Sequence, residues 1–550
     1  MRTLLTLAVG ALFSWQAQAA EKQPNILLIV ADDLGYSDIQ PFGGEVQTPS
    51  LQDLANQGAR LTNFYAGPTC SVTRSMLLSG VDSHQAGLGT MAEGMQPEQK
   101  GKPGYEGYLN FSVASIAELL GAAGYDTYMT GKWHLGGAPG QTPAARGFQQ
   151  SFILVQGGAS HVDLSEMFPG YAARYLDNDK PAQLPAQFYS SDLYTEQMLD
   201  YLKQGKRDGK PFFAYLAYTA PHWPLQAPEQ YIDKYRGQYD KGYEAIRQAR
   251  LARMQAQGLL PAGTSANVPM RNALPSWDEL TPAQRQEQAR TMEIYAAMID
   301  NLDHNIGRVL DYLKQTGELD NTFILFMSDN GAEGTTAAGL EIADWVRASF
   351  DNGPANMGRK GSYLTLGPQW GQVSATPFPY FKGFTSRGGI NVPAIVRYPK
   401  MVKAGQVNSR LFHAMDLMPS VLELAGVHYP ERYADRALLP LQGRSMLAGL
   451  ANASAQPQRE LGWELYGRRS LRKGDWSVQM QAPPYGSGHW ELYDLANDPS
   501  TLHDLSARYP EKTAELAAAW GRYAQHNGVV DAPVRYKYTY ENCLYDRCVK

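Results

Sequence analysis

Residues 24–35 read Pro-Asn-Ile-Leu-Leu-Ile-Val-Ala-Asp-Asp-Leu-Gly, an apolar run that leads directly into two carboxylates. The run from Asn25 to Val30 is continuous and rich in β-branched and other apolar residues, which is typical of a strand covered on both faces. Asp32 and Asp33 follow it almost at once. We therefore expect an α/β fold in which a polar site lies at the carboxyl end of this buried strand.

Two further segments repeat this arrangement. Residues 212–219 form a second apolar run, which is followed by Pro-His-Trp-Pro at 221–224. Residues 322–327 form a third, which is followed by Ser-Asp-Asn-Gly at 328–331. Ligands of open parallel sheets bind outside the carboxyl ends of the strands, so we expect these polar clusters to converge on one crevice.

Helical patterns lie between the strands. Apolar residues from Tyr295 to Leu313 recur at spacings of three and four, which predicts a helix that covers the sheet. Residues 125–129 predict another strand, which runs into Gly-Lys-Trp-His at 131–134. The polar stretch 235–283 breaks this rhythm, and we expect it to be an insertion over one edge. Shorter helices are predicted over 116–120 and 415–424.

The pattern changes after residue 455. Short strands are predicted over 476–480 and 490–495, and a helix over 510–523. We therefore expect a large α/β domain over 22–455, followed by a smaller α+β domain over 456–550 with an antiparallel sheet and a helix.

Size and composition exclude several classes of protein. The chain has 550 residues, 43% of them hydrophobic and 19% charged, which is enough for a large conventional core. Its formal net charge of -5 provides no basic field for a phosphate backbone, so we expect no nucleic-acid partner.

Residues 1–19 have the features of a signal peptide. Arg2 precedes a short apolar run, and Ala17-Gln18-Ala19 has the small-x-small form of a cleavage site. The run is about half of the roughly twenty residues that span a bilayer, and no later segment is long and apolar enough. We expect a periplasmic or secreted protein without membrane attachment; the alternative is an uncleaved apolar helix at the N-terminus.

The chain contains three cysteines, an odd number. An exported protein meets an oxidising compartment, where Cys543 and Cys548 could close a small loop near the C-terminus. This pairing leaves Cys70 alone. Residues 69–80 predict a turn that enters a short helix, which would put Cys70 at a helix N-terminus with Arg74 on the same face. The alternative is a buried structural cysteine beneath the sheet, with Arg74 paired to a surface carboxylate.

The chain resembles the sulfatase family of the alkaline phosphatase superfamily, and bacterial arylsulfatases in particular. The motifs that carry the resemblance occur in order at residues 24–35, 70–80, 131–136, 220–222, 328–331, 381–383, 387–389 and 491–495. The resemblance implies a large mixed, mostly parallel sheet flanked by helices, with a smaller C-terminal α+β domain. It also implies a sulfuric ester hydrolase that cleaves sulfate monoesters of small molecules or glycans.

The resemblance also implies a divalent-metal site. Asp32, Asp33, Asp329 and Asn330 match the family's metal ligands, and the modified Cys70 completes the set. Oxygen ligands without imidazole or thiolate suit a hard cation such as Ca²⁺. Taken separately, the two aspartates are more typical of a helix cap than of a metal site, and residues 328–331 are more typical of an ordinary turn; together, at two strand ends, they favour a metal site.

Five further residues match catalytic positions of the family. Lys132 and Lys382 match residues that hold sulfate oxygens, and Arg74 matches one that orients the nucleophile. His134 matches the histidine beside the nucleophile, and His222 the one at the leaving oxygen, where an imidazole can protonate a departing alkoxide.

In this family the motif cysteine is oxidised to formylglycine, whose hydrated aldehyde is the nucleophile, and a separate maturation enzyme makes the conversion. Cys70 would then be the catalytic residue. The usual signal is Cys-x-Pro-x-Arg, sometimes with Ala in the middle, whereas Val72 occupies that place here. Two alternatives remain open from the residues: a phosphoester or phosphonate monoester hydrolase on the same scaffold, or a binder of sulfated ligands with an unmodified Cys70.

Overall fold

The computed structural model describes residues 22–205, 209–336, 342–451, 458–532, 543–545 and 547–549. The predicted signal peptide, residues 1–19, lies outside the described residues, and so does the expected domain boundary between residues 455 and 456. Within the described part of the chain, no helix is long and apolar enough to cross a membrane.

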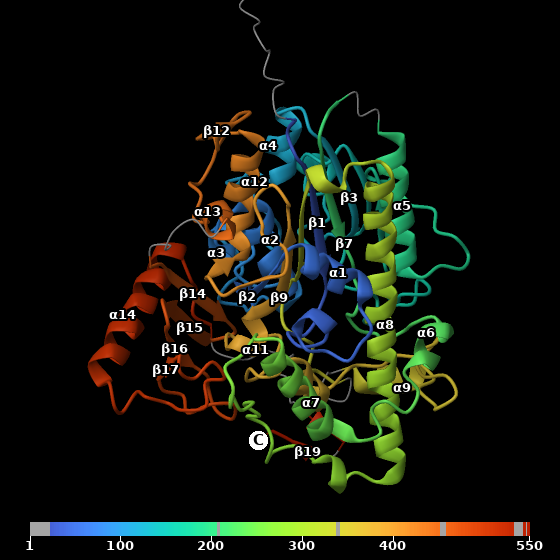
Figure 1. Cartoon of the computed structure of the whole chain (residues 1–550), viewed down its shortest axis with the longest axis vertical. Coiled ribbons are helices and arrows are strands. Elements are labelled where there is room, and N and C mark those ends of the chain that lie inside the picture. Colours follow the sequence, from blue (N-terminus) through green and yellow to red (C-terminus); the bar gives the residue numbers. More distant parts are fainter. Residues whose placement is uncertain are drawn as a thin grey trace, which may run out of the picture.

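A large twisted sheet forms the centre of the molecule (Figure 1). Among the described residues it has eleven strands, in the spatial order β10-β2-β9-β8-β1-β7-β3-β4-β5-β6, with β11 paired to β2. The strands are β1 (Asn25–Ala31), β2 (Ala59–Tyr65), β3 (Asp126–Lys132), β4 (Gln150–Leu154), β5 (Tyr175–Asp177), β6 (Lys180–Pro181), β7 (Phe212–Ala217), β8 (Thr322–Ser328), β9 (Asn391–Arg397), β10 (Gln406–Asn408) and β11 (Phe412–His413). The central run from β8 to β4 is parallel, and β9, β5 and β6 are antiparallel to their neighbours. The expected mixed, mostly parallel sheet is confirmed.

Strand β1 is buried on both faces, as its continuous apolar run predicts. Its alternate residues belong to different cores because successive side chains of a strand point to opposite faces. Leu27 and Ile29 contribute to one core, and Leu28 and Val30 to the other. The first core contains the apolar stripe of the long helix α8 (Pro282–Gln315), whereas the second contains residues of α2, α4 and α12.

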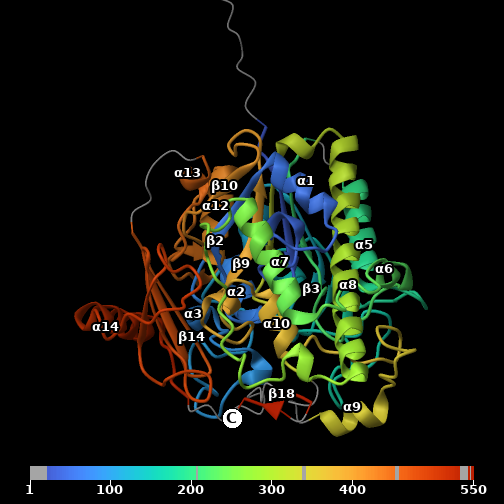
Figure 2. The ribbon, with the colours of Figure 1, turned by 60° about the horizontal axis from the view of Figure 1, so that its bottom comes forward.

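Helices therefore cover both faces of the sheet (Figures 1 and 2). Helix α8 packs against α1, α5 and α6 on one side, and α12 packs against α2 and α4 on the other. The remaining helices are α1 (Pro49–Gln57), α2 (Cys70–Ser79), α3 (Ser83–Ala86), α4 (Ile116–Ala122), α5 (Ser190–Gln204), α6 (Glu229–Lys234), α7 (Gly242–Ala256), α9 (Ala343–Ser349), α10 (Pro368–Ser374), α11 (Arg387–Ile390), α12 (Leu417–Ala425), α13 (Leu447–Leu450) and α14 (Pro510–Asn527).

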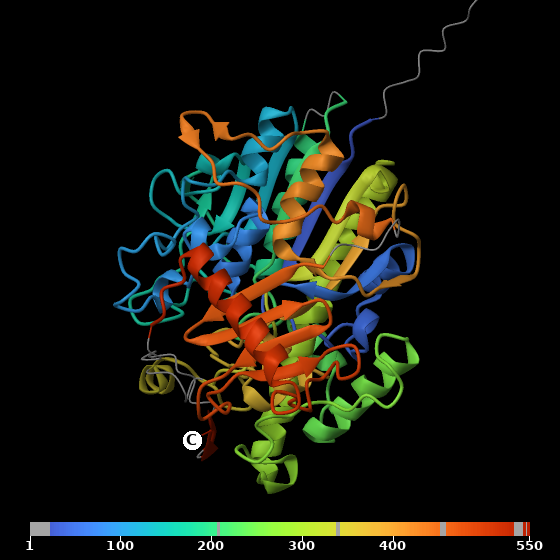
Figure 3. The same cartoon turned by 90° about the vertical axis from the view of Figure 1, so that its left-hand side faces the viewer.

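The C-terminal region forms a second, smaller sheet. Strands β14 (Glu460–Leu465), β15 (Arg468–Lys473), β16 (Trp476–Met480) and β17 (Glu491–Asp494) are antiparallel, and α14 lies across one face of them (Figure 3). Leu516 and Trp520 of α14 pack on Leu471 and Val478 of the sheet. The same region contacts the large sheet's domain through Trp463, whose indole N–H donates to the Ala66 carbonyl.

Small hairpins complete the fold. They are β12 (Arg432–Tyr433) with β13 (Arg436–Ala437), and β18 (Cys543–Leu544) with β19 (Arg547–Cys548). The expected disulfide between Cys543 and Cys548 is confirmed, and it closes the second hairpin.

One helix extends beyond its predicted limits, and the expected insertion contains a helix of its own. Helix α8 begins at Pro282, well before Tyr295, because Thr281 caps it and Gln284 completes a reciprocal capping box. The polar stretch 235–283 is not continuous loop, because it contains helix α7. Arg250 of this helix is completely buried and pairs with Asp38 and Glu45, while Leu251 and Met254 join the apolar core. Ion pairs and apolar contacts together hold the helix to the body of the protein.

Candidate active site

Three parallel strands bring the predicted polar clusters to the same edge of the sheet. Ala31 of β1 lies beside Ser328 of β8, and Val30 lies beside Ala217 of β7. The backbone N–H of Asp33 therefore donates to Oδ1 of Asp329 at 3.3 Å, although the two residues are far apart in sequence. The convergence expected from the strand ends is confirmed.

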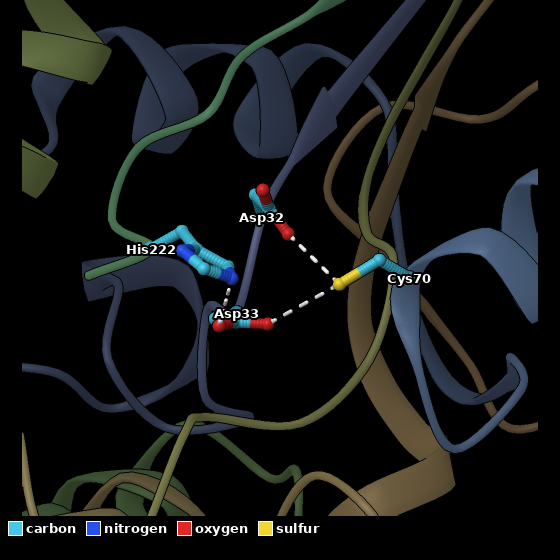
Figure 4. A group of neighbouring side chains, drawn as sticks. All are labelled: Asp32, Asp33, Cys70 and His222. Carbon is cyan, nitrogen blue, oxygen red and sulfur yellow. Dashed lines mark hydrogen bonds and ion pairs between the residues drawn. The ribbon is translucent and has the colours of Figure 1, made fainter. Parts of the chain in front are cut away.

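The conformation of Asp33 lets two consecutive carboxylates reach one point. Neighbouring residues of an extended strand point to opposite faces. Asp33 instead has a φ of 65°, in the left-handed region, where the chain turns sharply after β1. As a result Oδ1 of Asp32 and Oδ1 of Asp33 lie 3.3 and 3.8 Å from Sγ of Cys70 (Figure 4).

Cys70 is the first residue of α2, as the sequence predicts, and is buried. Burial and the Asp32 carboxylate raise the pKa of its thiol well above the usual value. The thiol is therefore neutral and donates its hydrogen to a carboxylate, which makes it a poor nucleophile as it stands. Cys70 is buried, as the structural alternative has it, but its sulfur lies against the side chains of Asp32 and Asp33 rather than among apolar groups.

Three cations face three carboxylates around Cys70, and all six side chains are buried. The shortest contacts are 2.8 Å for Arg74 with Asp329, 2.6 Å for Lys132 with Asp32, and 2.9 Å for Lys382 with Asp33. The alternative partner for Arg74, a surface carboxylate, is therefore wrong: Asp329 has no exposed surface. Each ion pair offsets the cost of removing its charges from water, so six charged side chains can be buried in one site.

The carboxylates differ in how readily they ionise. Burial alone would raise the pKa of Asp33, but Lys382, His222 and Lys132 hold it well below its usual range. Burial and the nearby Asp32 raise the pKa of Asp329 to about 6, in spite of its contact with Arg74. Asp329 is therefore more readily protonated than Asp33.

The donor set fits a hard divalent cation. Donor atoms of Asp32, Asp33, Cys70 and His222 lie within 4.8 Å of one another. Asn330 donates its amide hydrogens to Oδ1 of Asp33 at 2.7 Å and to the Gly331 carbonyl at 2.9 Å, while its Oδ1 is buried without a hydrogen-bond partner. A buried amide oxygen without a donor is costly, and a cation bound beside it would satisfy it.

His222 lies on the opposite side of Asp33 from Cys70. Its Nε2 is 3.5 Å from Oδ2 of Asp33, and its Nδ1 is 2.6 Å from the Trp223 carbonyl. Burial and the nearby lysines hold its pKa well below the usual value. The ring is therefore neutral, with its proton on Nδ1 for the carbonyl and a lone pair on Nε2 toward the site.

His134 follows strand β3 and approaches from another direction. Its φ of 58° turns the chain out of the strand. Its Nε2 lies 2.8 Å from Oε1 of Glu93, and its buried Nδ1 has no hydrogen-bond partner among the described residues.

The close packing of β3 against β7 depends on Gly131, where a Cβ would come within 1.8 Å of the Ala217 carbonyl oxygen.

A pocket opens above Cys70. Its lining combines polar residues of the site with apolar side chains. The pocket is lined by Cys70, Met91, Glu93, His134, Gly157, Gly158, Met167, Phe168, Tyr171, His222, Trp223, Glu333, Thr335 and Lys382. A ligand in this pocket would thus contact three of the predicted basic or imidazole side chains and the thiol.

The structure brings together every residue that the sequence predicts for the site. Sequence reasoning missed several of its neighbours, notably Glu93, Glu333 and Tyr215. Glu333 lies 3.2 Å from Lys382. Its position in the sequence, just after the 328–331 motif, could have indicated that it belongs to the site. Glu93 lies in a loop without a recognisable pattern, and Tyr215, which accepts from Arg74 at 3.2 Å, reads as an ordinary strand residue.

Comparisons with known proteins agree with this geometry. A family model described as Sulfatase matches residues 24–427. A Schizosaccharomyces pombe protein described as an uncharacterized sulfatase is 43% identical, over 94% of this chain and 97% of its own length. An arylsulfatase of Klebsiella aerogenes is 39% identical, over 81% of this chain and 96% of its own length.

Solved structures share the fold. One in complex with a neocarrahexaose has a TM-score of 0.66 and 23% identity, and covers 94% of each chain. Another, in complex with its substrate D-glucosamine-2-N,6-O-disulfate, has a TM-score of 0.60 and 22% identity, over 94% of this chain and 100% of the other. With the family match and the two close relatives, these findings show that the chain belongs to the sulfatase family of sulfuric ester hydrolases.

Proposed function

We propose that this protein hydrolyses sulfate monoesters to an alcohol or phenol and sulfate, with the reaction centred on Cys70. The observation that carries the proposal is the surrounding of Cys70: two carboxylates contact its sulfur, and the cations of Lys132 and Lys382 lie against the same carboxylates. Substitution at the sulfur of a sulfate ester passes through a trigonal bipyramidal transition state, and fixed positive charge beside the nucleophile stabilises the negative charge on its oxygens.

The proposed metal ligands are Asp32, Asp33, Asp329, Asn330 and the modified Cys70. The unpartnered oxygen of Asn330 and the carboxylates of Asp32 and Asp33 support a hard cation such as Ca²⁺. A bound divalent cation would supply positive charge beside the nucleophile and favour its ionised form. The proposal includes conversion of Cys70 to formylglycine by a maturation enzyme; the aldehyde hydrate would supply a hydroxyl nucleophile in place of the neutral thiol.

The chain's own side chains then have distinct roles. Lys132 and Lys382 hold the non-bridging sulfate oxygens and stabilise the charge that develops on them. Arg74 holds Asp329 and the end of β3, since its guanidinium also donates to the Lys132 carbonyl at 3.0 Å. His222 presents Nε2 to the leaving oxygen and protonates that oxygen after Nε2 has taken up a proton from solvent, and His134 accepts a proton on the side of Cys70.

Replacement of Asp329 tests the metal assignment. The Asp329→Ala variant should lose nearly all turnover of 4-nitrophenyl sulfate and should bind Ca²⁺ more weakly by calorimetry. Asp320→Ala is a matched control, because Asp320 is an exposed aspartate at the opposite end of β8. Full activity in Asp329→Ala would overturn the metal assignment. Faster hydrolysis of 4-nitrophenyl phosphate by the wild type would instead favour a phosphoester hydrolase, and ligand binding without turnover would favour a non-catalytic binder.

The wider organisation follows from the same proposal. We place the catalytic domain at 22–455 and the C-terminal subdomain at 456–550, because the four-stranded sheet and α14 form a separate core. We also propose removal of residues 1–19 as a signal peptide and a periplasmic or secreted location. The disulfide between Cys543 and Cys548 supports an oxidising compartment.

A further inference from the structure

Apolar side chains line part of the pocket that contains Cys70. Met91, Met167, Phe168, Tyr171 and Trp223 line it, and we call these five residues the apolar rim. We propose that the apolar rim binds the alcohol part of the substrate, and that this part is an uncharged aryl or alkyl group rather than a sugar. The inference rests on the proposed sulfate ester hydrolysis and specifies its substrate class.

The rim is built as a packed aromatic wall. The ring of Phe168 meets Trp223 edge to face at a centroid distance of 5.6 Å, and Tyr171 at 6.3 Å. Trp223 in turn stacks on His222 at 5.2 Å. An apolar group against this wall would therefore place its ester oxygen beside the imidazole proposed to protonate it. Tyr171 keeps 41% of its surface exposed, so the wall extends to the pocket mouth.

The two carboxylates in the pocket wall are already bonded to other protein groups. Glu93 pairs with His134, and Glu333 pairs with Lys382 and accepts hydrogen bonds from the backbone N–H and the hydroxyl of Thr335. A sugar would have to compete for these groups or bury its hydroxyls against carbon, which is unfavourable. Two carboxylates in the wall would also repel a second sulfate on the same molecule.

Primary alkyl sulfates test the inference, because their leaving groups have similar basicity and differ in apolar surface. We expect kcat/KM for ethyl, butyl and hexyl sulfate to rise by about fourfold for each added methylene that is buried, as hydrophobic transfer predicts. Glucose 6-sulfate, also a primary sulfate ester, should be at least about tenfold poorer than hexyl sulfate. Released sulfate gives the rates for protein whose Cys70 has been converted.

The test variant is Phe168→Ala in the apolar rim. The control variant is Phe111→Ala, because Phe111 is also a phenylalanine, is 41% exposed and does not line the pocket. Phe168→Ala should lower kcat/KM for hexyl sulfate by at least about tenfold and leave that for ethyl sulfate within about twofold. Phe111→Ala should change neither. Equal use of glucose 6-sulfate and hexyl sulfate would overturn the inference while leaving the proposed function intact. Absence of hydrolysis of any ester would overturn the proposed function itself.

A second inference concerns Glu93, and a different contact carries it. We propose that Glu93 is a positioning residue that fixes the orientation and tautomer of His134. Its carboxylate accepts a hydrogen bond at Nε2 of His134, at 2.8 Å. A carboxylate offers only acceptors, so the proton of the neutral imidazole lies on Nε2 and the lone pair on Nδ1.

The rest of the ring's environment supports this arrangement. Nδ1 of His134 is buried and has no hydrogen-bond partner among the described residues, as a proton acceptor waiting for substrate or hydrated aldehyde would be. The ring packs against the backbone of Gly157, where a Cβ would come within 2.5 Å of the ring carbon Cε1. The ring is therefore held between Glu93 and Gly157, with Nδ1 as its one unused polar atom.

A double-mutant cycle tests whether Glu93 acts through His134. Glu93→Ala should lower kcat by at least about tenfold with KM changed by less than about threefold, and should shift the acidic limb of the kcat profile to lower pH. Glu93→Gln should retain part of the activity, because an amide oxygen still accepts from Nε2. In a His134→Ala background the Glu93→Ala change should have no further effect on kcat. Additive losses, or an unchanged pH profile in Glu93→Ala, would overturn the inference even if the enzyme hydrolyses sulfate esters.

Discussion

Nζ of Lys132 lies 2.6 Å from Oδ2 of Asp32, and neither side chain has any exposed surface. The two residues come from adjacent parts of one sheet edge, at the ends of β3 and β1. Neither charge would be tolerated there alone, because a buried ion without a partner is strongly destabilising. Each side chain thus stabilises the other's charge and holds it ready for a substrate or cation.

Removal of this lysine should affect both stability and turnover. Lys132→Met leaves Asp32 buried without its cation, and we expect the free energy of unfolding to fall by about 3 kcal/mol. Turnover of 4-nitrophenyl sulfate should fall by at least about a hundredfold, since a cation at the sulfate oxygens is lost. Thermal unfolding and initial rates measure the two effects. Wild-type rates in Lys132→Met would refute its proposed role.

Removal of divalent cations should destabilise the folded protein. A cation that binds only the native state stabilises it by about 2.7 kcal/mol at a concentration one hundred times its Kd. Treatment with EDTA should therefore lower the melting temperature by several degrees and abolish turnover, and added Ca²⁺ should restore both. The Asp329→Ala variant is the control, because its melting temperature should not respond to either addition. An unresponsive wild type would argue against a metal at this site.

The contact between the two parts of the chain should depend on pH. His84 of α3 bridges Asp82 at 2.9 Å and Glu464 of β14 at 3.4 Å, and these bonds raise its pKa to about 9 although burial opposes its charge. A raised histidine pKa gives stability that is fully present below about pH 6.5 and lost as the pH rises through 9, on the order of 3 kcal/mol. Unfolding of wild type and His84→Gln at several pH values measures it.

The difference in stability between those two proteins should be largest at pH 6, should shrink as the pH rises from about 6.5, and should be nearly lost above pH 9. A constant difference over this range would mean that His84 contributes through packing and not through its charge. Activity at pH 7 is a useful companion measurement, because His84 does not line the pocket.

Proline at position 72 should be tolerated. Val72 is the third residue of α2, in its first turn, and the helix's first backbone hydrogen bond is donated by the following residue, Thr73, to Thr69. A proline there removes no bond from the helix. We expect Val72→Pro to fold with a loss of about 1 kcal/mol from its packing and to convert Cys70 at least as completely as wild type. Mass spectrometry of the Cys70 peptide gives the fraction; lower conversion would contradict this reading of the motif.

Much of the fold follows from the sequence, because the strands that position the site are buried on both faces. Their apolar runs, as in residues 25–30, and the carboxylates that follow them are local signals of an α/β sheet with a site at its edge. The helix stripe from Tyr295 is equally local. The start of this helix at Pro282 was missed because its first turns are polar and depend on capping by Thr281.

The site was predictable as a set of motifs, but not as a geometry. Motif residues such as Asp33, Cys70 and Lys382 come together because β1, α2 and the loop after α10 meet at one place, which no local pattern reports. Glu93 was missed because its contact with His134 depends on a loop conformation. The character of the apolar rim was also hidden, since Met167 and Phe168 read as ordinary loop residues until the pocket is seen.

The chemical state of Cys70 tests the central claim most directly. The claim is that a neutral, carboxylate-bound thiol gives way to a formylglycine nucleophile, and the conversion lowers the residue mass by about 18 Da. Mass spectrometry of the tryptic peptide from Leu61 to Arg74, taken from active protein, measures it. We predict a peptide with this mass loss, in proportion to the specific activity. An unmodified Cys70 peptide from fully active protein would contradict the account.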